Sequence, residues 1–263
     1  MRENHLKRLW REGQSALGGW LTVPSSFSAE IFAISGFDWV CVDTQHGLID
    51  YQTSVTMLQA LSTTEVVPIV RVPWNEPGII MKSLDAGAYG VIVPMVNSKA
   101  EAEAAVAACR YAPDGIRSHG PLRAAIYGGR DYSAKANETL LCITMIETRQ
   151  AIENLDEILS VPGVDAAYVG PSDLGVSLGV GPGADHEEKV FSDAIQAVLD
   201  ACERHGVVPG IHGGNVTTAR KRVEQGFRFV EMCSDSDALF RTAIGDLKAV
   251  RGASGAGGAP ADV

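Results

Sequence analysis

Two carboxylate residues stand where an apolar run gives way to a turn and then to a helix-like pattern. Glu147 follows the run LLCITMI, and Asp173 follows AAYVGPS. In proteins of alternating strands and helices, the loops at the carboxyl ends of the strands open onto one face, where chemistry collects. The pair therefore predicts a shared divalent metal ion, although each residue taken singly is equally compatible with a helix N-cap or an ordinary surface carboxylate.

Two further side chains of suitable chemistry follow other apolar runs. His46 lies three residues beyond WVCVD, and Arg71 lies near the end of VVPIVRV. Histidine gives and takes protons near neutral pH, and the planar fork of arginine suits a carboxylate or a developing enolate oxygen. With a metal ion to bind the carbonyl and carboxylate oxygens of a 2-keto acid, these residues predict carbon–carbon bond chemistry through a stabilised enolate.

The lysines favour this metal-dependent mechanism over an imine mechanism. A Schiff-base lysine needs burial near the pocket to lower its pKa. All seven lysines fall in expected helices, helix starts or loops, and none lies within an expected strand: Lys7, Lys82, Lys99, Lys135, Lys189, Lys221 and Lys248.

The elements that must position these residues are eight apolar runs separated by helix-like segments. Their continuous apolar character is typical of parallel strands buried on both faces. Eight such strands in one chain predict an α/β fold, a closed (β/α)8 barrel. The runs are ALGGWLTV (16–23), DWVCVD (38–43), VVPIVRV (66–72), GVIVPMV (90–96), LLCITMIE (140–147), AAYVGPS (166–172), VVPGIHG (207–213) and FRFVEMC (227–233).

The segments between the runs carry helix signals or form longer intervals. Three-to-four residue spacing predicts helices over 25–35, 76–87 and 98–110. The intervals 112–135 and 174–189 are longer, and we expect extended loops there on the catalytic face.

Composition and length limit the class of protein. The 263 residues carry a net charge of −10, which argues against binding nucleic acid, and no apolar stretch reaches the length of a membrane span. Five scattered cysteines favour a reducing cytosol and hence a cytoplasmic location. We expect one barrel domain over 1–252 and a disordered tail over 253–263, where Gly, Ala and Pro predominate.

In these same segments the chain resembles the HpcH/HpaI aldolase family of metal-dependent pyruvate aldolases. The resemblance runs from about Leu17 to Arg241 and includes FDWVCVDTQHG, VVPIVRVPWNEP, LDAGAYGVIVPMV, CRYAPDGIRS, MIETRQAIENLDEIL and GVDAAYVGPSDLGVSLG. It implies a modified barrel of the phosphoenolpyruvate/pyruvate type. It also implies a hexamer, a trimer of dimers, in which neighbouring subunits exchange their last helix. The implied reaction is reversible aldol cleavage of 4-hydroxy-2-keto acids to an aldehyde and pyruvate, or a related 2-keto acid such as hydroxypyruvate.

The resemblance also assigns roles to individual positions. It matches Glu147 and Asp173 to ligands of Mg²⁺, Mn²⁺ or Co²⁺, Arg71 to the substrate-binding arginine and His46 to the catalytic base. Asp43 matches an acidic residue near that histidine in the hydrogen-bonding network.

Three other matches concern the walls of the site. Asp85 corresponds to an acidic residue that reaches the site from an adjacent subunit, and Trp20 to a pocket-wall aromatic. The backbone amides near Gly170, Pro171 and Ser172 correspond to the turn that receives the keto-acid carboxylate, although proline itself cannot donate.

Two positions differ from those of many family members, and two additional histidines could contact the substrate. Gln45 stands where many relatives have Glu, and Met145 where many have Gln, so a carboxylate beside the base and a polar group near the metal are lost. His119 and His212 are additional groups that could face an aldehyde.

Two other functions stay open at this point. The first is a lyase acting on a coenzyme A thioester, which the lack of an extended basic segment disfavours. The second is a non-catalytic metal-binding barrel. The residues do not identify the aldehyde or the preferred metal.

Overall fold

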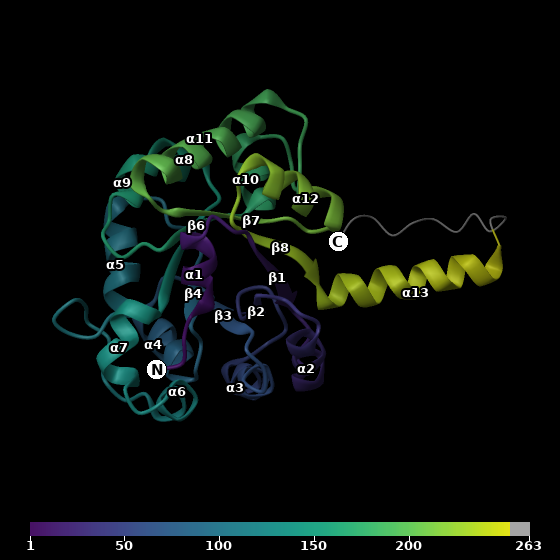
Figure 1. The fold of residues 1–263 in the computed structure, drawn as a ribbon. Coiled ribbons are helices and arrows are strands. Elements are labelled where there is room, and N and C mark those ends of the chain that lie inside the picture. Colours follow the sequence, from purple (N-terminus) through teal and green to yellow (C-terminus); the bar gives the residue numbers. More distant parts are fainter. Residues whose placement is uncertain (253–263) are drawn as a thin grey trace.

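The computed structural model describes residues 1–252 and consists of a closed barrel of parallel strands surrounded by helices (Figure 1). Each strand pairs with the next one in the chain, and β8 closes the barrel against β1. The predicted (β/α)8 fold is confirmed, and each predicted run coincides with one strand, of which β8 extends one residue past the predicted end at 233. The expected tail, 253–263, lies outside the described residues. The strands are β1 (Ala16–Leu21), β2 (Trp39–Asp43), β3 (Val67–Arg71), β4 (Gly90–Val93), β5 (Leu141–Ile146), β6 (Ala166–Val169), β7 (Val208–His212) and β8 (Phe229–Ser234).

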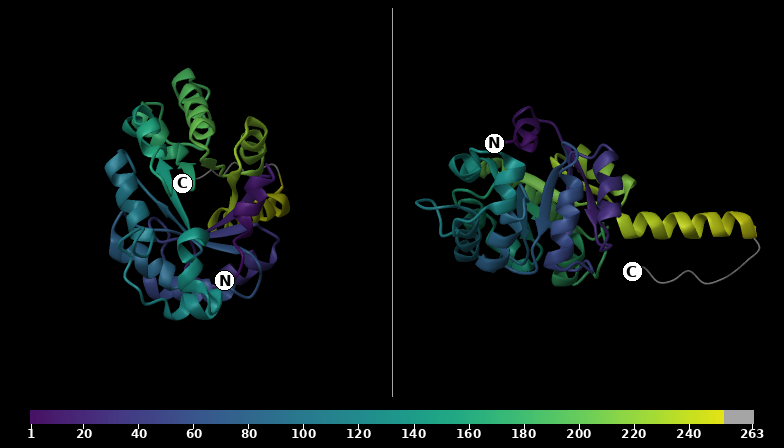
Figure 2. Two further views of the ribbon diagram at one scale, coloured as in Figure 1. Left: turned by 60° about the vertical axis from the view of Figure 1, so that its left-hand side comes forward. Right: turned by 90° about the horizontal axis from the view of Figure 1, so that it is seen from below.

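The described helices other than α13 cover the outside of the barrel and its N-terminal end (Figure 2). They are α1 (His5–Arg11), α2 (Ser26–Ile34), α3 (Tyr51–Leu61), α4 (Pro77–Asp85), α5 (Lys99–Cys109), α6 (Leu122–Gly128), α7 (Tyr132–Thr139), α8 (Arg149–Glu153), α9 (Leu155–Leu159), α10 (Pro171–Leu178), α11 (Lys189–His205), α12 (Val216–Gln225) and α13 (Asp235–Arg251).

Capping residues explain why the helices begin just after the strand ends. Glu76 accepts hydrogen bonds from the amides of Gly78 and Ile79 at the start of α4, where Pro77 needs no hydrogen-bond partner for its nitrogen. Thr148 caps α8 in the same way through the amide of Ala151. Each cap turns the chain sharply from strand to helix, so the last residues of the strands are presented at one mouth of the barrel.

The opposite mouth is closed by α1. The Trp10 indole donates a hydrogen bond to the Arg228 carbonyl, just before β8 begins, and packs edge-on against Phe229 at 5.6 Å. Leu6 of the same helix is fully buried. Access to the barrel is therefore from the C-terminal ends of the strands.

The expectation for 112–135 was wrong. This segment contains α6 and the first half of α7 rather than an extended loop. It also lies at the N-terminal end of the barrel, because α5 has already returned the chain to that end. Two hydrogen bonds show this position: the Arg2 amide donates to the Gly128 carbonyl, and the Leu141 amide donates to the Tyr89 carbonyl, just before β4. The interval 174–189 does follow β6 at the catalytic end, but its first five residues belong to α10.

The last helix, α13, projects away from the barrel (Figures 1 and 2). Of its residues only Asp235 is buried, and its exposed side chains include Leu239, Phe240, Leu247 and Val250. Within residues 1–252, no helix is both long and apolar enough to cross a membrane.

Candidate active site

The strand register places Asp43 and Arg71 side by side at the open mouth. They are direct partners in the pairing of β2 with β3. Arg71 donates to both carboxylate oxygens of Asp43, from Nε at 2.9 Å and from Nη2 at 2.5 Å. Both side chains are buried, and such a paired fork holds the guanidinium in one orientation.

Asp43 also accepts hydrogen bonds from the turn that carries His46. Its carboxylate accepts from the backbone amides of Gln45 and His46 at 3.0 and 3.3 Å, and its side-chain partner is Arg71 rather than the imidazole of His46. Burial alone would raise the pKa of Asp43, but the hydrogen bonds and charge of Arg71 outweigh it and hold the pKa below its usual value. His46 is exposed in the turn that Asp43 shapes.

Trp20 forms the wall behind this pair. Its indole nitrogen donates to Asp43 at 3.2 Å, and the Arg71 guanidinium carbon lies 4.9 Å from its ring centroid. The Trp20 side chain is only 2% exposed, and its contacts with Asp43 and Arg71 help to fix the orientation of both side chains.

Glu147 follows β5 directly and is 2% exposed. Its Oε1 accepts the backbone amide of Met95, which follows β4, at 2.7 Å. Burial raises the pKa of Glu147 to about 7; the Met95 amide and Arg71 lower it, whereas the negative charge of Asp173 raises it further. Arg71 and Asp173 therefore lie close enough to Glu147 for their charges to shift its pKa.

The turn after β6 brings Asp173 to the site but supplies fewer amides than expected. The Gly170 amide donates to the Ile146 carbonyl at 3.2 Å as part of the sheet, and Pro171 has no N–H. This leaves the amide of Ser172, in the first turn of α10, as the one of the three that can receive a carboxylate. The Gly170 amide is engaged in the sheet because strand pairing continues one residue past β6.

Gly170 has a different role, which is to leave space. A Cβ at this position would lie 2.6 Å from Oε2 of Glu147 and 2.6 Å from the methyl carbon of Met145. Only glycine allows the chain after β6 to approach Glu147 and Met145 this closely. The space beside Oε2 of Glu147 therefore stays open.

Glu147 and Asp173 fit a divalent cation. A buried carboxylate with a raised pKa beside a second carboxylate gains from positive charge between them. Among residues 1–252 no group of three or more His, Cys, Asp or Glu side chains could hold a metal. The protein would thus contribute these two carboxylates, and water and substrate oxygens would complete the shell.

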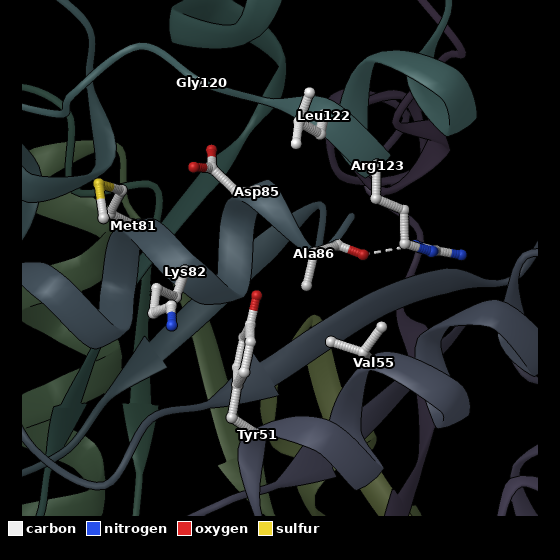
Figure 3. A pocket seen from close by; sticks show the side chains of 9 residues that line it. All are labelled: Tyr51, Val55, Met81, Lys82, Asp85, Ala86, Gly120, Leu122 and Arg123. Carbon is white, nitrogen blue, oxygen red and sulfur yellow. Dashed lines mark hydrogen bonds between the residues drawn. The ribbon is translucent and has the colours of Figure 1, made fainter.

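Asp85 does not join the site of its own chain. It is the last residue of α4, at the N-terminal end of the barrel, and its carboxylate pairs with Arg117 at 2.6 Å. Figure 3 shows it beside Met81 and Gly120 at a cavity of about 250 Å³ on the outside of the barrel. A role in catalysis would therefore need a second subunit. His119 likewise lies outside the site, where it contacts Ser133 at 2.8 Å.

Glu231 and Tyr168 lie beside His212 at the mouth, and neither was anticipated from the sequence. Glu231 is fully buried in β8 and is the register partner of His212 in β7, with 3.5 Å between Oε2 and Nε2. The Tyr168 hydroxyl lies 3.3 Å from Nδ1 of His212, whose ring packs edge-on against Trp20 at 5.0 Å. A glutamate inside an apolar run was the only signal for this group.

The lysines lie where the sequence placed them. None of the seven is buried: Lys7 is half-buried in α1 at the N-terminal end, and the other six are exposed. No lysine therefore has the buried position at the mouth that imine chemistry requires.

Met145 and Gln45, which differ from the residues of many relatives, lie near Glu147 and Asp43, respectively. Met145 is buried, with its methyl group near Gly170 and hence near Glu147. Gln45 lies in the turn after β2, where its amide donates to Asp43.

Comparison with known proteins identifies the family of this chain. The family model described as HpcH/HpaI aldolase/citrate lyase matches residues 17–242, and the chain belongs to that family. The chain is 42% identical over 250 residues to a hydroxypyruvate/pyruvate aldolase of Rhizorhabdus wittichii, covering 94% of this chain and 100% of that protein. It is 39% identical over 244 residues to a 4-hydroxy-2-oxo-heptane-1,7-dioate aldolase of Escherichia coli, covering 92% of each. A crystal structure of a family member from Burkholderia cenocepacia superposes with a TM-score of 0.88 at 33% identity, covering 95% of this chain and 100% of that one.

Proposed function

We propose that this protein is a divalent-metal-dependent aldolase that cleaves and forms 4-hydroxy-2-keto acids, with pyruvate or hydroxypyruvate and an aldehyde as the other reactants. The observation that carries the proposal is the buried Glu147, with its pKa raised to about 7, beside Asp173 and Arg71 at the open mouth. The aldolase relatives at 39–42% identity support the same reaction.

Glu147 and Asp173 would hold the metal ion, Mg²⁺, Mn²⁺ or Co²⁺. When bound, such an ion supplies positive charge that polarises the keto-acid carbonyl and favours its enolate. Arg71, held by Asp43 and Trp20, contributes a fixed cation for a carboxylate or enolate oxygen. The Ser172 amide, in the first turn of α10, would receive the keto-acid carboxylate.

His46 is the proposed proton carrier. It lies exposed in the turn after β2, whose backbone is tied to Asp43, so its position is defined relative to Arg71. In the cleavage direction a base removes the proton of the C4 hydroxyl, the C3–C4 bond breaks to release the aldehyde, and the enolate then takes a proton at C3. The relatively open position of His46 permits exchange of that proton with water.

Exchange of the pyruvate methyl protons with deuterium tests the proposal directly. We expect exchange, followed by NMR, that needs added Mn²⁺ or Mg²⁺ and stops on chelation. Exchange without metal, or loss of activity on treatment with borohydride and pyruvate, would show an imine mechanism. A thermal shift with acetyl-coenzyme A but none with pyruvate and Mg²⁺ would instead support the coenzyme A lyase.

We also propose that the protein acts as a homo-oligomer, a hexamer built as a trimer of dimers, in which α13 packs on a neighbour. Two features support an assembly: α13 leaves its own barrel with Leu239 and Phe240 exposed, and Asp85 lies on the outside of the barrel. In this arrangement Asp85 would complete a neighbour's site. A cytoplasmic location remains a prediction from the cysteines.

A further inference from the structure

A network of hydrogen bonds behind Glu147 has no role in the mechanism above. It is centred on the loop that follows β4, where Met95 has a φ of 55°. Among the described residues, Met95 is the only non-glycine residue in the left-handed region. Such a conformation costs free energy and persists where the surroundings enforce it, which occurs often at functional sites.

The left-handed Met95 has a direct consequence for Glu147. Its backbone amide points at Oε1 of Glu147, with a separation of 2.7 Å. This contact crosses from β4 to β5 and occupies one oxygen of the carboxylate, so Oε2 remains on the side of Gly170. The orientation of Glu147 therefore depends on the peptide of Met95.

Asn97 holds Met95 from the carbonyl side of the residue. Its Nδ2 donates to the Met95 carbonyl at 2.9 Å, and its Oδ1 accepts from the hydroxyl of Thr148, the residue next to Glu147. Its backbone is also engaged at both ends: the amide donates to Glu101 at 2.7 Å, and the carbonyl accepts from Asn154 at 2.7 Å. One side chain thus connects the loop after β4 to the turn that carries Glu147.

We propose that Asn97 is a positioning residue that holds Met95 in its left-handed conformation, with the Met95 amide against Glu147, and thereby sets the affinity of the site for a divalent cation. The inference rests on the proposed metal site. Partners of ligating carboxylates fix the orientation of the ligand, and their removal commonly weakens metal binding about 10- to 100-fold.

Binding of Mn²⁺ alone, measured on the full chain by electron paramagnetic resonance of the free ion, tests the inference. Asn97→Ala is expected to raise the Kd about 10- to 100-fold. Asn75→Ala is the matched control, because its Nδ2 donates to the Glu101 carbonyl at 2.9 Å without contacting Glu147 or Met95. The control should bind Mn²⁺ as the wild type does.

A double variant separates positioning from general stability. Glycine adopts positive φ readily, so adding Met95→Gly to Asn97→Ala should restore affinity by at least about threefold. A purely structural role for Asn97 would lower Tm without this rescue. If Asn97→Ala fails to fold, Asn97→Ser carries the same expectation.

The outcomes are distinct. Wild-type affinity in Asn97→Ala overturns the inference, and a double variant no tighter than the single variant overturns the role of the Met95 peptide. Absence of Mn²⁺ binding in the wild type, or binding that survives Glu147→Ala, overturns the proposed metal site itself.

Discussion

At the scale of single residues, the buried environment of Glu147 sets its pKa and hence its affinity for a cation. Burial and the charge of Asp173 raise its pKa to about 7 from an ordinary value of 4.5. Between about pH 4.5 and pH 7, the carboxyl of Glu147 is therefore protonated in the metal-free folded protein and ionised in the unfolded chain. A cation that requires the ionised carboxylate competes with this proton. The site should therefore bind metal more tightly as the pH rises through about 7.

The same shift predicts how stability depends on pH. Because the folded-state pKa of Glu147 is raised, its stabilising contribution is complete below about pH 4.5 and is lost as the pH rises to about 7. The free energy of unfolding of the metal-free protein should fall by roughly 3 kcal/mol over that window. Glu147→Gln should remove this fall, as measured by denaturant titration at several pH values. An unchanged pH dependence in Glu147→Gln would contradict the assignment.

Asp43→Asn tests the buried ion pair. It leaves the buried Arg71 without a negative partner, and we expect a loss of about 3–5 kcal/mol of unfolding free energy together with a higher KM for pyruvate. Asp50→Asn is the control: Asp50 caps α3 at an exposed position, and asparagine caps helices equally well. Equal stability of the two variants would show that the pair contributes little.

At the scale of elements, the approach of β6 to β5 shapes the metal site. Gly170→Ala would place a methyl group 2.6 Å from Oε2 of Glu147, so the carboxylate or the strand must move. We expect a loss in kcat/KM on the order of 100-fold, as is typical of an ångström-scale displacement, and weaker Mn²⁺ binding. In the control Gly245→Ala, on α13 and away from the metal site, the added atom meets no other atom of its own chain, and Mn²⁺ binding should not change. Normal Mn²⁺ binding in Gly170→Ala would show that the site tolerates the methyl group.

At the scale of the whole molecule, the proposed assembly predicts complementation between subunits. Asp85 is distant from the site of its own chain but would complete that of a neighbour. Glu147→Ala and Asp85→Ala should each be inactive alone, whereas exchange of their subunits should restore part of the aldolase activity, because some sites then receive both intact residues. Size-exclusion chromatography should show the same oligomer for each variant. Activity of the mixture no higher than the sum of the two, or a fully active Asp85→Ala, would contradict the shared site.

Much of the barrel could be predicted from local patterns. Apolar runs located all eight strands, and capping residues such as Ser98 and Thr148 begin helices directly after strand ends. The segment 112–135 was misjudged because its glycines and prolines, such as Gly120, Pro121, Gly128 and Gly129, are typical of turns. The end of the barrel at which it lies depends on how far α5 carries the chain.

The sequence by itself determined which residue types end each strand, and therefore that Glu147, Asp173, Arg71 and His46 share one mouth. The tertiary structure decided how they are held: Asp43 opposite Arg71, Glu231 opposite His212, and the Met95 amide on Glu147. The reason is physical. Burial periodicity is local and can be read along the chain, whereas register and hydrogen-bond partners are set only when eight strands close on one another.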